Sequence, residues 1–328
     1  MFTDLFVTKI YTNFEVIDDN KVDVCFSVDH QRHQYNQYNR KCTNMIFTIC
    51  SDRLIVKLDS VGAQLISVVF DGKERLWQND NGSWTSHAPT LFPVCGRVSA
   101  LVDGKPIDLP QHGVVRHKEF VGTQPDAATV VLTTSSNELT REHYPFDWRY
   151  TLTFRVDGDT MYITHEVVNT GKQTMYFALG GHESFVLQND VGNYYVRLPQ
   201  DDVLVGLLHD NNARLSGETR TFGEGGVIHL PADFLDGSTM VFGNIKSREA
   251  ILCADDGTEL AVTRFDGFGN FMLWRPHEAH MICLEPWLNM LDSADNPTTE
   301  LKDKQGFVAL SAGETKVYNR SVQYKAYK

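Results

Sequence analysis

Asp-Gly dipeptides recur along this chain of 328 residues and separate runs in which apolar and polar residues alternate. An Asp-Gly pair readily adopts the positive φ angles of a two-residue hairpin loop, and such a loop joins antiparallel strands. The alternation in Tyr150–Val156 is typical of a strand with one buried and one hydrated face. The chain is therefore constrained towards antiparallel β structure. The six pairs are Asp71-Gly72, Asp103-Gly104, Asp157-Gly158, Asp236-Gly237, Asp256-Gly257 and Asp266-Gly267.

Four further segments are rich in β-forming residues, namely Leu54–Leu58, Ala63–Phe70, Met161–Val168 and Val322–Ala326. No segment sustains an apolar period of 3.6 residues, and Ser136–Glu142 is at most a short helix. No internal repeat and no Pro/Ser-rich linker divides the main body. A β-sandwich commonly forms a single domain of this size. We therefore predict an all-β fold, a large antiparallel β-sandwich.

The first part of the chain differs from the rest. Gln31–Arg40 is polar, compositionally biased and without a period, which indicates a flexible segment. Lys21–Val28 alternates and could be a strand. We predict that residues 1–44 are an N-terminal extension and that residues 45–328 form the main domain. An upstream start site is an equally simple origin for the extension.

Charge and cysteine content narrow the class of protein. The net charge of −12 argues against nucleic acid or an anionic membrane as the main partner. No CxxC pair or metal-type spacing links the cysteines, so a disulfide framework is not expected. No run is long enough to span a bilayer, and the N-terminus lacks a secretory pattern. We predict a soluble cytoplasmic protein. Its six cysteines are Cys25, Cys42, Cys50, Cys95, Cys253 and Cys283.

Two polar residues, His182 and Glu285, follow apolar strand-like runs and are flanked by small or aromatic residues. Burying either alone would be costly unless it had a partner. If the fold brings them together, they form a general acid–base pair. Two further clusters contain candidate polar residues. In one, Arg97 follows Gly96; in the other, His112 precedes Gly113, and Arg116 comes three residues later. Singly, each residue has an ordinary interpretation as a surface histidine, a strand-end arginine or a core tryptophan.

Taken in order, these clusters resemble those of the aldose 1-epimerase (galactose mutarotase-like) superfamily, most closely its LacX-like branch. The resemblance runs from about Met45 to the C-terminus and implies an all-β supersandwich. The segments that carry it are Leu76-Trp77-Gln78, Ala88-Pro89-Thr90-Leu91-Phe92-Pro93, Gln111-His112-Gly113, Tyr144-Pro145-Phe146-Asp147, Gly180-Gly181-His182 and Cys283-Leu284-Glu285-Pro286-Trp287.

The resemblance implies an isomerase that interconverts the α and β anomers of an aldohexose by opening and reclosing the ring. In that reaction Glu285 would be the base at the anomeric hydroxyl and His182 the acid at the ring oxygen. An unperturbed imidazole, with a pKa of about 6.5, can exchange protons near neutrality. No metal or organic cofactor is expected, and the protein would be a monomer or homodimer. Substrate contacts would come from Arg97, His112, Arg116, Trp287 and Asp233, with Trp274, Phe185 and Asp236 as weaker candidates.

Departures from the family leave the substrate open. The hexose-6-phosphate branch has an Arg-Gly-Gly run where this chain reads Thr85-Ser86-His87, so a free sugar is favoured over a sugar phosphate. Arg97 and Arg116 keep the phosphate alternative open, because arginine binds phosphate well.

Three other classes remain. One is a non-catalytic carbohydrate-binding protein on the same fold. A second is a glycoside hydrolase, which would pair Glu285 with Asp292 or Glu183. The third is a metal site of His112, His182 and Glu285, although no HxH or HExxH spacing supports it.

Overall fold

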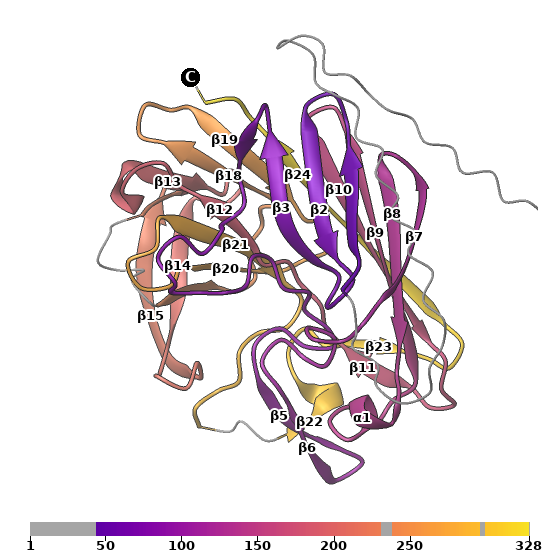
Figure 1. The fold of residues 1–328 in the computed structure, drawn as a ribbon. Coiled ribbons are helices and arrows are strands. Elements are labelled where there is room, and N and C mark those ends of the chain that lie inside the picture. The colour runs from indigo at the N-terminus through magenta and orange to yellow at the C-terminus, as the bar shows by residue number, and fades with distance from the viewer. Residues whose placement is uncertain (1–43, 231–237, 296–298, 328) are drawn as a thin grey trace, which may run out of the picture. The chain divides into compact units, whose positions relative to one another are not determined.

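The computed structural model of the protein describes residues 44–230, 238–295 and 299–327, all within one compact unit. Most of the strands join one large sheet in which each pair of neighbours is antiparallel. Figure 1 labels most of these strands. In spatial order they are β12 (Glu183–Val186), β21 (Met281–Trp287), β20 (Asn270–Trp274), β17 (Thr239–Phe242), β14 (Val203–His209), β15 (Leu215–Glu224), β16 (Val227–His229), β13 (Tyr194–Arg197), β18 (Glu249–Ala254), β19 (Glu259–Arg264), β24 (Thr315–Tyr324), β10 (Thr160–Asn169), β9 (Trp148–Asp157), β8 (Thr129–Ser135) and β7 (Val121–Asp126).

Smaller sheets complete the fold. The first contains β1 (Ile46–Cys50), β2 (Leu54–Asp59), β3 (Gln64–Phe70) and β4 (Lys73–Glu74). A second pairs β11 (Met175–Phe177) with β23 (Val308–Leu310), and a third contains β22 (Thr299–Glu300), β5 (Val98–Val102) and β6 (Lys105–Leu109). The short helices are α1 (Glu138–Arg141) and the 3₁₀ turns η1 (Val191–Asn193) and η2 (Leu301–Asp303). The predicted all-β antiparallel sandwich is therefore confirmed.

Several Asp-Gly pairs lie in the hairpin turns that the sequence predicts, whereas Asp266-Gly267 lies between β19 and β20, which do not pair with each other. Both residues of Asp71-Gly72, between β3 and β4, have positive φ, and so do both residues of Asp103-Gly104, between β5 and β6. Gly158 has positive φ in the two-residue loop that joins β9 to β10. The Asp236-Gly237 pair lies outside the described residues. Local turn chemistry thus sets these hairpins.

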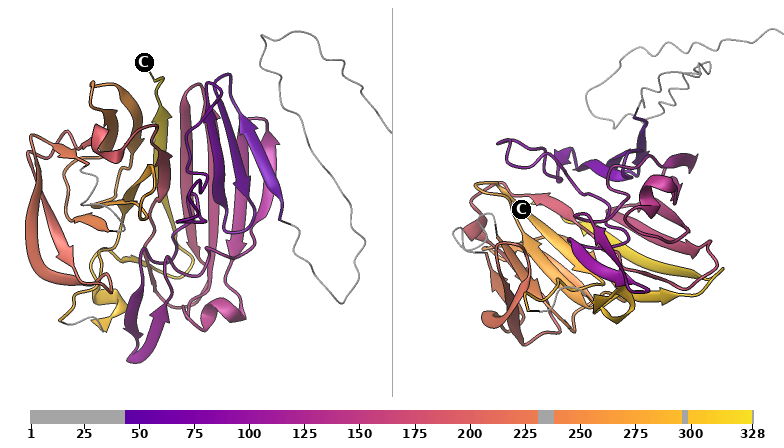
Figure 2. Two further views of the ribbon diagram at one scale, coloured as in Figure 1. Left: turned by 60° about the vertical axis from the view of Figure 1, so that its left-hand side comes forward. Right: turned by 90° about the horizontal axis from the view of Figure 1, so that it is seen from below.

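The core lies between the small sheet β1–β4 and the strands β8–β10 of the large sheet, which pack face to face in Figures 1 and 2. Along β9, alternate residues are buried, and Tyr150 stacks on Phe92 with ring centroids 4.5 Å apart. Burying a large apolar side chain stabilises a fold by about 1.5–3 kcal/mol. The apolar residues that alternate along the sequence of β9 therefore lie on the buried face of the strand and pack into the main core.

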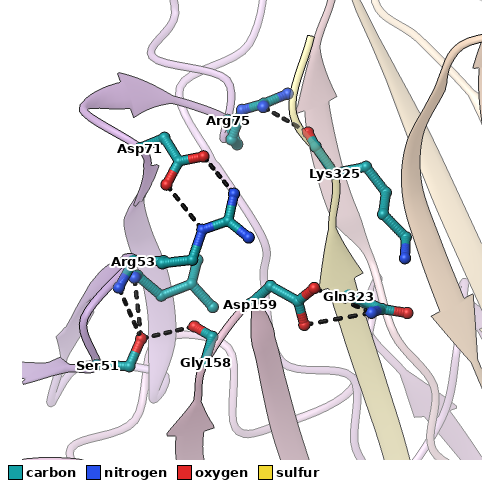
Figure 3. A network of polar contacts seen from close by, with 9 residues as sticks. Ser51, Arg53, Asp71, Arg75, Gly158, Asp159, Gln323 and Lys325 are labelled. Carbon is teal, nitrogen blue, oxygen red and sulfur yellow. Dashed lines mark hydrogen bonds and ion pairs between the residues drawn. The ribbon is translucent and has the colours of Figure 1, made fainter.

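Polar contacts at the rim join the two layers (Figure 3). The hydroxyl of Ser51, after β1, donates to the carbonyl of Gly158 at 2.6 Å. The guanidinium of Arg75, after β4, donates to the carbonyl of Lys325 at 2.7 Å, just beyond β24. These bonds hold the N-terminal sheet against the strands behind it. Within the described ranges, no helix is long and apolar enough to cross a membrane. The predicted extension, residues 1–44, lies almost wholly outside those ranges, so its boundary stays a prediction.

Candidate active site

His182 and Glu285 meet at the edge of the large sheet. Strands β12 and β21 pair with Glu183 opposite Leu284, and one step along this register His182 reaches Glu285. The imidazole Nε2 lies 3.4 Å from the carboxyl Oε2, and the two side chains are only 6% and 2% exposed. The fold therefore brings together the acid–base pair that the sequence singles out.

The glycines before His182 allow this approach. The Gly181 amide donates to the Pro286 carbonyl at 2.9 Å. A Cβ on Gly180 would lie 2.7 Å from Cys95 Sγ and 2.8 Å from the same Pro286 carbonyl oxygen. Those distances are too short for any side chain without a backbone shift. Glycine is therefore required where this segment packs against β21.

Burial sets the charges of the pair. Burial lowers the pKa of His182 to about 3, and the nearby Arg116 guanidinium adds to the shift. Burial also raises the pKa of Glu285 well above its usual range, with a further contribution from the Glu183 carboxylate. The Trp287 indole N–H opposes that rise but falls short of a hydrogen bond. Burial thus favours the form of the pair in which the carboxyl holds the proton and the imidazole is neutral.

His112 supplies a second neutral imidazole. Its ring is perpendicular to that of His182, with centroids 5.0 Å apart. The Gly96 amide donates to His112 Nδ1 at 3.2 Å, which places the ring proton on Nε2, and Nε2 lies 3.2 Å from the side-chain amide of Gln111. Burial, with the charges of His182 and Arg116, lowers the pKa of His112 well below its usual range. His112 therefore presents an N–H donor and no positive charge.

The two predicted arginines have different surroundings. Arg116 is half-buried, donates to the Ser86 hydroxyl at 2.8 Å and lowers the pKa of both imidazoles, so its charge is felt at the site. Arg97 is 67% exposed and forms an ion pair with Asp108 at 2.6 Å. The structure thus places Arg116, and not Arg97, beside the pair, and a substrate role for Arg97 stays a prediction.

Tryptophans surround the pair, including one that sequence reasoning missed. Trp84 stacks on the His182 ring at a centroid distance of 5.3 Å, and Trp274 lies edge-on to it at 5.8 Å. Trp287 lies edge-on to the His112 ring, at a centroid distance of 6.0 Å. The only feature of the sequence that could have pointed to Trp84 is its position as a large aromatic residue within a polar segment.

The remaining predicted contacts do not join this group. Phe185 lies in the main core, because strand alternation turns it to the face opposite His182, so its placement in the sugar wall was wrong. Asp233 and Asp236 lie outside the described residues.

Three buried histidines predict acid-sensitive stability. Burial lowers the pKa values of His112, His165 and His182, so the folded protein keeps these rings neutral where the unfolded chain would protonate them below about pH 6.5. Unfolding then takes up protons, so stability falls as the pH falls. The raised pKa of Glu285 acts in the opposite direction and offsets the contribution of about one histidine. We expect a net loss of about 2–3 kcal/mol between pH 6 and pH 5. Urea unfolding at the two pH values measures it, and an unchanged or higher midpoint at pH 5 would contradict the expectation.

Similar proteins share this fold. A galactose mutarotase-like protein from Lactobacillus casei superposes with a TM-score of 0.80 at 26% identity, covering 86% of this chain and 100% of the other. A galactose 1-epimerase from Lactobacillus acidophilus gives a TM-score of 0.66 at 15% identity, covering 88% and 97% of the two chains. Fold and site together define a galactose mutarotase-like β-sandwich with a buried histidine–glutamate pair.

Sequence comparison identifies the family. The profile of the aldose 1-epimerase family matches residues 45–300, and the chain belongs to that family. The chromosomal LacX protein of Lactococcus lactis is 25% identical over 283 residues, which cover 79% of this chain and 93% of LacX. Membership supports a sugar epimerase or mutarotase role with a small carbohydrate substrate.

Proposed function

We propose that the protein interconverts the α and β anomers of a free aldohexose by acid–base catalysis at His182 and Glu285. The observation that carries the proposal is the buried pair itself, with His182 Nε2 and Glu285 Oε2 3.4 Å apart. Ring opening removes the proton of the anomeric hydroxyl and adds one to the ring oxygen. One site that holds an acceptor and a donor a few ångströms apart suits both transfers.

The proton balance of the cycle fits this pair. With Glu285 as base and His182 as acid, ring opening leaves a protonated carboxyl and a neutral imidazole. The aldehyde rotates about its C1–C2 bond, and reclosure then returns one proton to the carbonyl oxygen and takes one from the C5 hydroxyl. The charge state that burial favours in the free protein is the state left after ring opening, so ring opening with these roles begins only after the proton has moved from Glu285 to His182.

Neighbouring groups support a sugar substrate. A sugar oxygen that takes the place of the Gln111 amide would meet a neutral donor in the Nε2–H of His112. Trp84, Trp274 and Trp287 offer apolar surfaces to the C–H face of the sugar. A second carboxylate for glycoside hydrolysis lacks support, because Glu183 is held by Arg320 and Asp292 by Lys304.

Anomer relaxation tests the proposal. Freshly dissolved α-glucose or α-galactose is followed by polarimetry with the full chain in EDTA, and glucose 6-phosphate is run in parallel. We expect relaxation faster than in buffer, and faster for a free sugar than for the phosphate. Saturable sugar binding without acceleration would instead indicate a non-catalytic carbohydrate-binding protein. A preference for the phosphate would instead favour the hexose-6-phosphate 1-epimerase alternative.

A further inference from the structure

The acid–base pair has a third neighbour that the proposed reaction does not use. Strand alternation places Cys283 on the same face of β21 as Glu285. One ligand atom each from His182, Cys283 and Glu285 lie within 4.8 Å of one another, and all three side chains are buried. An imidazole nitrogen, a sulfur and a carboxylate oxygen therefore converge on one point.

The spacing of the pair fits two ligands of one ion. Tetrahedral zinc binds nitrogen and oxygen at about 2.0–2.2 Å, so two such ligand atoms lie about 3.4 Å apart. His182 Nε2 and Glu285 Oε2 are 3.4 Å apart, beyond the usual range of a hydrogen bond. The Cys283 sulfur needs a shift of about 1 Å or less to reach its own ligand distance.

The chemistry of the three donors selects the ion. A thiolate and an imidazole favour zinc and its analogues over magnesium and calcium, which prefer oxygen ligands. A thiolate and a carboxylate together balance the two charges of the cation, which reduces the cost of burying it.

We propose that His182, Cys283 and Glu285 form a three-ligand binding site for a divalent ion of the zinc class. An ion bound there takes up the lone pair of the imidazole and the negative charge of the carboxylate. Neither group could then exchange protons with a sugar. The ion is thus an inhibitor, a consequence that rests on the proposed epimerase function, whereas binding itself does not.

Cobalt(II) gives a direct optical test of binding. Metal-free full-length protein, prepared with EDTA and freed of the chelator, is titrated with Co²⁺. We expect a thiolate-to-cobalt charge-transfer band in the near ultraviolet that saturates at one ion per chain and disappears on addition of Zn²⁺. In Cys283→Ala the band should be lost. Cys95→Ala is the matched control, because Cys95 is an equally buried thiol outside the group of three, and its band should persist.

Inhibition is measured separately by anomer relaxation. Zn²⁺ should slow the wild-type protein, EDTA should restore it, and Cys283→Ala should need at least about tenfold more Zn²⁺ for the same effect. Absence of the cobalt band, or an undiminished band in Cys283→Ala, would overturn the site. A clear band on addition of Co²⁺, together with no acceleration of relaxation by the metal-free protein, would instead support the site and refute the proposed function.

Discussion

Replacing Glu285 with glutamine should lower the turnover of anomer relaxation by about 10²–10⁴-fold while sugar binding persists. The amide matches the carboxyl in shape, so the strand pairing of β21 with β12 is kept. An amide cannot take up or return the proton that the pair carries between the anomeric hydroxyl and the ring oxygen. The turnover number, measured by polarimetry, should therefore fall, whereas the dissociation constant of the sugar, measured by calorimetry, should stay unchanged.

A second buried carboxyl provides the control. Asp292 also has a pKa raised by burial, and it pairs with Lys304 at 2.5 Å. Asp292→Asn should keep turnover within a few fold, since that carboxyl has no part in the proposed proton transfers. Near-normal turnover in Glu285→Gln would remove the assigned base. Equal losses in both variants would favour a mechanism with two carboxylates.

Local structure was predictable from the sequence because its causes are local. The Asp-Gly pairs and the alternation of Tyr150–Val156 determine hairpins such as β9–β10 whatever lies around them. The order of strands in the large sheet has no such local cause. The neighbours of β12 and β24 depend on pairings between segments far apart in the chain, which a single sequence does not display.

Some residues of the candidate site could likewise be predicted from the sequence, and others could not. His182 and Glu285 could be found because each stands as a costly polar residue in an apolar run. Trp84 could not, because its stacking on His182 depends on the path of a loop that the Trp77 indole holds by bonding to the Trp84 carbonyl. The ion pair of Arg97 with Asp108 depends on the β5–β6 register, which is equally hidden.

Behind the site lies a buried polar network that sequence reasoning also missed. Glu183, on the face opposite His182, receives Arg320 Nη1 at 2.9 and 2.7 Å on its two oxygens. Arg320 Nε donates to His165 Nε2 at 3.1 Å, and His165 Nδ1 lies 2.7 Å from the Tyr150 hydroxyl. His165 is neutral, because burial lowers its pKa well below the usual range, so Nδ1 carries the proton and donates to Tyr150. Arg320 thereby links β24 to the edge strand that follows His182.

Arg320→Met should therefore lower the free energy of unfolding by about 3–5 kcal/mol, because it leaves the Glu183 carboxylate buried without its cation. Arg155→Met is the matched control: Arg155 pairs with Asp157 at the surface, and its loss should cost about 1 kcal/mol or less. Adding Glu183→Leu to Arg320→Met should recover much of the loss, since two apolar side chains need no counter-charge. Urea unfolding measures all three. Equal losses of unfolding free energy for the two arginine variants would show that the buried ion pair contributes no more than a surface one. If the loss of Arg320 also displaces His182, the folded Arg320→Met variant should show slower anomer relaxation.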